Sequence, residues 1–357
     1  MSSNFIRRAC ATAAASAVVL TTLVGCSDAA DTASDQASEA SSAVESAAES
    51  ATSDEAAFPR TVSTVDGAGA ETEVIIEEQP QRIVSASVSL TGGLLALDAP
   101  VVATGGGQGA SPVFSDEEGF AVQWEDVARE RGVESMYQNE PSAEAILAQN
   151  PDLVVMSNVG ADKATDVYAQ IAEVVPVIVI DYSKQSWEDV TTQLGEATGR
   201  EDRAEEVITD FNDKVSAASE KITLPPQPVN IVSLTSDGGM NFFTEESAQG
   251  NLFRELGFEL GVPPEELVGA TAQGRARSDI KGVTAENIAP AMTGETVFVL
   301  NLDPGIPADE QVRTKPDLQN NPAVASDRVI ALGPEAFRLD YYSATDLVEY
   351  LEGLYGK

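Results

Sequence analysis

Short apolar runs alternate with helical patterns from Arg82 onward, and this alternation constrains the fold more than any other feature. The runs are rich in β-branched residues and bounded by Gly and Pro, which is typical of strands buried on both faces of a mostly parallel sheet. One set comprises residues 82–85, 101–104, 153–157 and 177–180, and a second set comprises residues 230–234, 296–300 and 328–332. The pattern predicts an α/β protein with two Rossmann-like lobes, each built on a mostly parallel sheet.

A long amphipathic segment separates the two sets. Its apolar residues recur at helical spacing, and acidic residues crowd its first turn. The apolar positions are Ala204, Val207, Ile208, Phe211, Val215, Ala218 and Ile222. We therefore expect a long helix that bridges the lobes at a nearly fixed spacing. This organisation predicts an N-terminal lobe at 58–185, a linking helical segment at 186–224 and a C-terminal lobe at 225–357.

The absence of histidine narrows the possible functions. Without it the chain has no Ser-His-Asp or Cys-His catalytic set and no histidine ligand for zinc, copper or haem. The two cysteines, Cys10 and Cys26, lie near the N-terminus, which excludes a fold stapled by disulfides. A formal net charge of −37 argues against nucleic acid as a partner, because duplex binding needs clustered Lys and Arg. No nucleophile has a recognisable base beside it, so we predict a binding protein that is not an enzyme.

The N-terminus has the features of an export signal. Arg7 and Arg8 precede an uncharged apolar run of 17 residues that ends in Leu-Val-Gly before Cys26. Small residues before such a cysteine predict a lipoprotein signal at 1–25, with Cys26 as the lipid-bearing first residue of the mature chain. An ordinary secretory signal with a chance cysteine is the alternative. Residues 26–57 are rich in Ala, Ser and acids, which predicts an extended, disordered tether. We expect a protein that is lipid-anchored on the extracytoplasmic face of the cell membrane.

An internal repeat supports two related lobes. The segment 141–155 resembles the segment 283–299, since each has a hydroxyl residue expected to cap a helix N-terminus (Ser142 and Thr284), then Ala-Glu, a short helix, a break and a buried strand. Glu144 and Glu286 fall at matching places, 142 residues apart. An acid in the first turn of a helix is also favoured for local electrostatic reasons. As a matched pair, the two glutamates suggest equivalent surface contacts for a partner with two-fold character.

Scarce basic residues point to the ligand. Arg275 and Arg277 form the densest basic cluster outside the signal, and Arg338 lies beside Tyr341 and Tyr342 just after a predicted strand. A loop at 237–244 carries two aromatics, Phe242 and Phe243. Arginine and aromatic side chains at a cleft suit a flat, anionic, aromatic ligand. The alternatives are an ion pair of Arg338 with Asp340 or a neighbouring acid, and core packing of the two phenylalanines. The glycines at 105–109 lack the Gly-Lys-Ser/Thr of a phosphate loop, so we interpret them as a turn.

Several longer motifs resemble the ferric enterobactin-binding proteins of bacterial ABC importers. The similarity runs from about Phe58 to the C-terminus. The motifs are Gln81–Gly92, Leu94–Val101, Gln123–Trp124, Val127–Arg131, Glu140–Ala145, Leu224–Val229, Thr244–Gly250 and Phe337–Ala344. The resemblance implies a helical-backbone substrate-binding protein that carries a ferric catecholate siderophore in its cleft to a permease with an ATPase.

The resemblance also implies roles for individual residues. Arg338 matches an arginine that faces the anionic iron chelate, and Phe243 occupies the place of a tryptophan that packs on catechol rings. Glu144 and Glu286 match paired acids that meet permease arginines. Two departures concern the ligand: no base stands near Val113, where the family has an arginine, and the loop with Arg275 and Arg277 is one residue longer.

The sequence thus predicts a monomeric substrate-binding protein with no resident cofactor or directly bound metal and a ferric siderophore as transported ligand. The ligand-binding residues are expected to be Arg338, Phe243, Arg275, Arg277 and Tyr342. Another bulky ligand, such as a hydroxamate siderophore, a corrinoid or haem, is the alternative within binding proteins. An extracellular hydrolase and an anchored structural protein are the alternatives of other classes.

Overall fold

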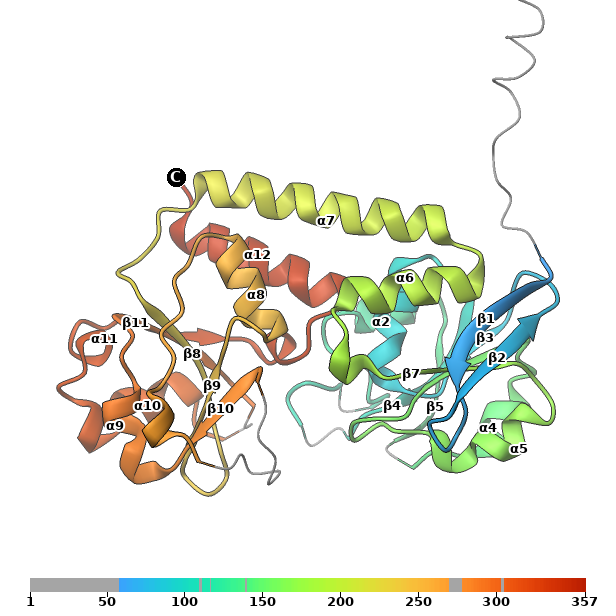
Figure 1. Cartoon of the computed structure of the whole chain (residues 1–357), viewed down its shortest axis with the longest axis horizontal. Helices are drawn as coiled ribbons and strands as arrows, with labels where there is room; N and C mark the ends of the chain where they lie inside the picture. Colours follow the sequence, from blue (N-terminus) through green and yellow to red (C-terminus); the bar gives the residue numbers. More distant parts are fainter. Residues whose placement is uncertain (1–57, 109–110, 116, 139, 270–277, 303–304) are drawn as a thin grey trace, which may run out of the picture. The chain divides into compact units, whose positions relative to one another are not determined.

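The computed structural model describes residues 58–357, apart from 109–110, 116, 139, 270–277 and 303–304. Its strands form two five-stranded sheets and one two-stranded sheet, and helices cover the larger sheets (Figure 1). The predicted α/β class with two Rossmann-like lobes is confirmed. Throughout the described part of the chain, no helix is both long and apolar enough to cross a bilayer.

The N-terminal sheet is fully parallel. Its strands lie in the order β5-β4-β3-β6-β7, so β3, the first of them in the sequence, is at the centre. This is the Rossmann strand order, in which the direction of chain progression across the sheet reverses between β3 and β6. The strands are β3 (Ile83–Ser85), β4 (Val101–Gly106), β5 (Glu134–Gln138), β6 (Leu153–Ser157) and β7 (Val177–Ile180). The predicted strands of the first set are all present, whereas the polar edge strand β5 gave no apolar signal.

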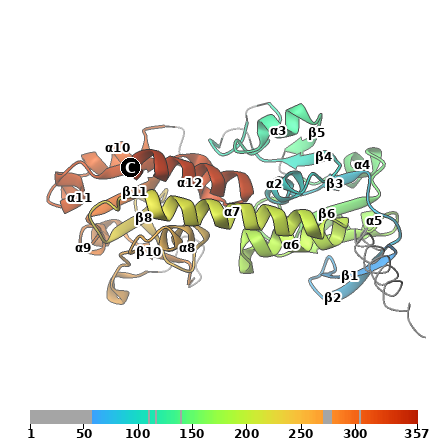
Figure 2. The same cartoon turned by 90° about the horizontal axis from the view of Figure 1, so that it is seen from above.

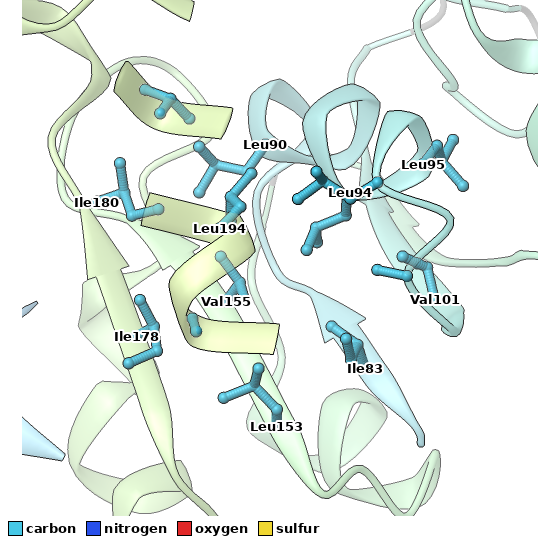
Figure 3. Packing of buried hydrophobic residues seen from close by; sticks show 14 of the residues in the cluster. Ile83, Leu90, Leu94, Leu95, Val101, Leu153, Val155, Ile178, Ile180 and Leu194 are labelled. Atoms are coloured by element: carbon cyan, nitrogen blue, oxygen red, sulfur yellow. The ribbon is translucent and has the colours of Figure 1, made fainter. Parts of the chain in front are cut away.

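Two cores sandwich this sheet, because successive side chains of a strand point to opposite faces. On one face Ile83, Val155 and Ile178 pack under α2 (Val88–Ala96) and α6 (Trp187–Thr198), as Figure 3 shows. On the other face the adjacent strand residues pack against α4 (Ala143–Ala148) and α5 (Tyr168–Ala172). The antiparallel hairpin of β1 (Arg60–Val65) and β2 (Glu71–Ile76) joins the edge strand β7 through paired hydrogen bonds between Thr64 and Val179 of 3.0 and 2.9 Å.

The C-terminal sheet is mostly parallel, as predicted, because four of its five strands run in one direction and β9 alone of the five runs in the opposite direction. Its order is β10-β9-β8-β11-β12; β8, β11 and β12 are parallel, while β9 runs antiparallel to both of its neighbours. The predicted loop at 237–244 in fact contains β9, because its turn sends the chain straight back along β8. The strands are β8 (Val229–Leu234), β9 (Met240–Phe243), β10 (Ile280–Val283), β11 (Thr296–Leu300) and β12 (Val329–Leu332). The other helices are α3 (Glu125–Glu130), α8 (Ala248–Glu255), α9 (Ile288–Ala291), α10 (Ala308–Thr314), α11 (Pro322–Ala325) and α12 (Tyr341–Tyr355).

The predicted bridging helix is α7 (Glu201–Lys221), which lies beside α6 and α12 in Figure 2. The helical segment is broken at Gly199, whose φ of +67° ends α6 in a left-handed turn. One apolar stripe of α7 serves both lobes. Ala204 packs in the N-terminal core, whereas Phe211 and Val215 pack in the C-terminal core. The helix therefore joins the lobes by contributing different side chains of one stripe to each core.

Candidate functional site

A cavity of about 240 Å³ lies at the carboxyl ends of the parallel strands. Three walls come from the N-terminal lobe, from the loops after β3, β4 and β6, and the fourth is the segment Pro334–Asp340 after β12. Ligands of open α/β sheets bind in this place, outside the carboxyl ends of strands and next to the reversal of strand order. The fold therefore brings both lobes to one candidate binding site.

Aromatic side chains form the apolar part of the cavity. Phe114 and Trp124 line it from the N-terminal lobe, and Phe337 lines it from the C-terminal lobe with 36% of its surface exposed. Trp124 is itself buried and packs 5.5 Å from the ring of Phe120, which holds its orientation. Gly107 permits the close approach of the Phe114 ring, because a Cβ at this position would overlap that ring. Such a surface suits flat rings of a ligand.

Arg338 is the basic side chain among the described residues that line the cavity. Its Nη1 lies 3.5 Å from Asp162 Oδ1, donates to Tyr182 Oη at 3.2 Å and donates to Ser89 Oγ. Its Cζ lies 5.4 Å from the centre of the Tyr182 ring, within range of a cation–π contact. All of these partners belong to the N-terminal lobe. The expected alternative, an ion pair with a neighbouring acid, is thus realised with Asp162 across the cleft and not with Asp340.

Asp162 is held firmly on the N-terminal wall. Its Oδ2 accepts from the backbone N–H of Ser89 at 2.8 Å, and its Oδ1 accepts from the Tyr182 hydroxyl at 2.9 Å. Its backbone carbonyl accepts from Ser87 Oγ at 2.6 Å. Burial, with the nearby Asp162 charge, raises the pKa of Tyr182 to about 12, so this hydroxyl stays a donor at neutral pH.

Asp340 closes the end of the cavity that faces α2. It is the N-cap of α12 and accepts from Ser343 N at 3.0 Å, while Gln123 Nε2 donates to its other oxygen at 3.1 Å. The residue lines the cavity, but its carboxyl group is enclosed by protein, and this burial raises its pKa. Gly92 on α2 allows the approach, because a Cβ there would overlap the carboxylate and lie 2.9 Å from Trp124 Cδ1.

The structure brings only part of the predicted ligand set to the cavity. Arg338 lines it, whereas Phe243 is 3% exposed in the C-terminal core and Tyr342 packs against the N-terminal core, where burial raises its pKa to about 12. Phe242 is also a core residue, so core packing is correct for both phenylalanines. Arg275, Arg277 and Cys26 lie outside the described residues. Val113, the position without the family's base, does line the cavity.

Sequence reasoning missed several lining residues. Asp162 and Ser89 follow β6 and β3 closely, so the rule that ligands bind at strand carboxyl ends could have found them. Phe337 and Trp124 stand inside the motifs quoted above, but nothing in the sequence indicated that their rings face a cavity. The predicted turn of glycines is also partly wrong, because Gly105 and Gly106 end β4.

The two repeated glutamates lie on exposed first turns. Glu144 is in α4, whose N-cap Ser142 accepts from Ala145 N at 3.2 Å, as predicted. Glu286 is in a short 3₁₀ turn before α9, and Thr284 at its start makes no capping hydrogen bond through its side chain, which corrects that part of the prediction. In Figure 1 α4 and α9 both lie on the side of the sheets away from α7.

A cavity between two α/β lobes that a long helix bridges defines a substrate-binding protein. Within the described residues there is no cluster of three or more Cys, Asp or Glu side chains that could hold a metal ion.

Residues 84–336 match the model of the periplasmic binding protein family, and the chain belongs to that family. It is 43% identical over 301 residues to the ferric enterobactin-binding periplasmic protein FepB of Escherichia coli O6:H1, covering 84% of this chain and 92% of FepB. It is 28% identical to the probable siderophore-binding lipoprotein YfiY of Bacillus subtilis, over 54% of this chain and 56% of YfiY. Among solved structures, holo-ViuP superposes with a TM-score of 0.71 at 29% identity, covering 84% of this chain and 96% of ViuP.

Proposed function

We propose that this chain captures a ferric siderophore of the catecholate type and delivers it to an ABC permease and its ATPase, without covalent chemistry. The observation that carries the proposal is the 43% identity to FepB, which extends over 84% of this chain and 92% of FepB. The cavity supports it independently, because it offers aromatic surfaces from both lobes and an arginine.

The chemistry of the ligand fits these side chains. A ferric catecholate presents flat rings around an anionic iron centre, for which Phe114, Trp124 and Phe337 supply packing surfaces and Arg338 supplies charge. The iron arrives already coordinated by ligand oxygens, so no histidine or thiolate is needed. The formal charge of −37 does not forbid an anionic ligand, because distant surface charges are screened beyond about 8 Å at physiological salt.

Tryptophan fluorescence tests this function. Trp124 lines the cavity, whereas Trp187 packs 4.9 Å from Phe211, so Trp187→Phe leaves Trp124 as the single tryptophan. Titration with ferric enterobactin is expected to quench the Trp124 signal at sub-micromolar concentration. A neutral ferric trihydroxamate, a corrinoid and haem complete the panel. Quenching by one of these and not by any ferric catecholate would overturn the catecholate assignment.

Arg338→Ala is the matching affinity test. A charge-assisted hydrogen bond contributes about 1.5–3 kcal/mol. Arg338 is 39% exposed and must leave Asp162 to meet a ligand, so we expect the lower end, roughly a tenfold increase in Kd. Arg254→Ala on α8, a half-exposed arginine away from the cavity, is the control. Equal affinities of the two variants would make Arg338 a structural residue.

We propose that Glu144 and Glu286 contact the permease. Both are exposed, on matching segments of the two lobes. Exchange of both for Lys is expected to abolish siderophore uptake while the Kd of the purified protein stays unchanged. The double exchange of Glu205 and Glu220, exposed acids on α7, for Lys adds the same charge as a control. Loss of uptake in both double variants would point to a general charge effect and contradict the docking role.

We further propose that residues 1–25 are removed, that Cys26 carries lipid and that residues 26–57 act as the tether. Cys26→Ala is expected to abolish incorporation of radiolabelled palmitate and to release the protein from washed membranes. Retention of the label in this variant would exclude Cys26 as the anchor.

A further inference from the structure

We propose that Asp162 sets how strongly the binding cavity responds to ligand charge: its carboxylate weakens the binding of a trianionic ferric complex and leaves the binding of a neutral one nearly unchanged. This inference rests on the proposed siderophore-binding function. It concerns a residue that the motifs discussed above leave without a role.

The first support is the charge of the cavity. Among the described side chains that line it, Asp162, Glu335 and Asp340 are acidic and Arg338 is basic. Val113 stands on the same lining with an aliphatic side chain. As far as the described residues form the lining, an anionic complex therefore meets the Arg338 guanidinium together with the nearby Asp162 carboxylate.

The second support is the pairing of the two opposed charges. Arg338 Nη1 lies 3.5 Å from Asp162 Oδ1 across the cleft. A ligand anion that takes a hydrogen bond from this guanidinium competes with a carboxylate already in place. In a partly enclosed site, where Asp162 is 11% exposed, such a pair is screened less than a surface pair.

The third support is that Asp162 keeps its position without Arg338. The Ser89 N–H at 2.8 Å and the Tyr182 hydroxyl at 2.9 Å hold one carboxylate oxygen each, and both belong to the same lobe as Asp162. When Arg338 turns toward a ligand, the negative charge of Asp162 consequently remains on the wall. Each added negative charge on the ligand then meets the same fixed repulsion.

The consequence is a preference that depends on ligand charge. Three catecholates around Fe³⁺ leave three negative charges in excess, whereas three hydroxamates give a neutral complex. Removal of the Asp162 charge is therefore expected to help the first complex and to leave the second nearly unchanged. Asp162 is a specificity-determining residue in this sense, and a purely structural role would change both affinities alike.

The test measures Kd for ferric enterobactin and for a neutral ferric trihydroxamate by Trp124 fluorescence in the Trp187→Phe background. Asp162→Asn is expected to tighten enterobactin binding on the order of tenfold and to move trihydroxamate binding by less than about twofold. Asp166→Asn is the matched control, because it makes the same change at an exposed acid that pairs with Lys163 and is not among the described residues of the cavity lining; it is expected to change either Kd by less than about twofold. If Asp162→Asn lowers the melting temperature of the protein, Asp162→Ala is used to repeat the test.

The outcomes separate the two proposals. Unchanged enterobactin affinity in Asp162→Asn and Asp162→Ala overturns the role of Asp162, while binding by the parent chain still supports the siderophore function. The same gain in Asp166→Asn, or a gain for both probes alike, also overturns it. Failure of the parent chain to bind any ferric catecholate or hydroxamate removes the proposed function and this inference with it.

Discussion

Gly92→Ala is expected to destabilise the protein through a contact between the lobes. The new Cβ would overlap the Asp340 carboxylate and lie 2.9 Å from Trp124 Cδ1, so the carboxylate must move. Asp340 would then lose its capping bond to Ser343 N and its bond from Gln123.

The change in the free energy of unfolding follows from contributions of opposite sign. Alanine in place of glycine inside a helix such as α2 favours folding by about 1 kcal/mol. Loss of an N-cap disfavours it by about 1 kcal/mol, and a buried carboxylate left without a partner disfavours it by about 1–3 kcal/mol. We therefore expect a net loss of about 1–3 kcal/mol in the free energy of unfolding.

Gly93→Ala provides the control in the same helix. Its Cβ would lie 2.8 Å from Leu194 Cδ1, a terminal methyl group that can rotate away, so we expect a change within about 1 kcal/mol. Urea denaturation followed by circular dichroism gives both values. A Gly92→Ala protein that is as stable as Gly93→Ala would refute the proposed role of the Asp340 contact.

Three further outcomes are expected. Phe211→Ala should cost about 3–5 kcal/mol in urea denaturation, because Phe211 is 3% exposed and packs edge-on against Trp187; a loss under 1 kcal/mol would contradict its part in the shared stripe of α7. Burial raises the pKa of the Asp340 carboxyl, so its ionisation disfavours folding as pH rises above about 4, the ordinary pKa of Asp. Asp340→Asn, which caps equally well, should therefore gain stability relative to the parent as pH rises above about 4 in urea denaturation, and a stability difference that does not change with pH would contradict this. Val113→Arg should tighten ferric enterobactin binding several-fold in the fluorescence titration, and an unchanged Kd would contradict the placement of Val113 on the cavity.

Sequence patterns predicted the parallel strands because each is a continuous apolar run buried on both faces. They missed β5 and β9 for two different reasons. β5 is a partly exposed edge strand of mixed residues, and β9 is part of a hairpin whose pairing is decided by the turn before it. The apolar stripe from Ala204 to Ile222 predicted α7. Which of its residues pack in which core depends on the residues of each lobe that lie against the helix, and the stripe alone does not give this.

The candidate site was less accessible to sequence reasoning. Arg338 was found because arginines are scarce in this chain and because it follows a predicted strand. Phe243 carries the same aromatic signal as Phe337, yet Phe243 points into the core from β9 while Phe337 lines the cavity. Core residues cover both faces of β9, so both of its phenylalanines are buried, whereas Phe337 lies in a turn after β12; neither β9 nor this turn was predicted. The pairing of Arg338 with Asp162 joins residues 176 positions apart, which no local pattern specifies.

The cavity is completed by a segment near the end of the chain. Residues 334–340 supply its fourth wall, and the other described residues on its lining precede residue 163. During synthesis, the part of the wall formed before residue 163 therefore emerges long before residues 334–340. A chain that stops short of Pro334 would present Asp162 without the Arg338 guanidinium opposite it, so the cavity that the described residues form depends on this late segment.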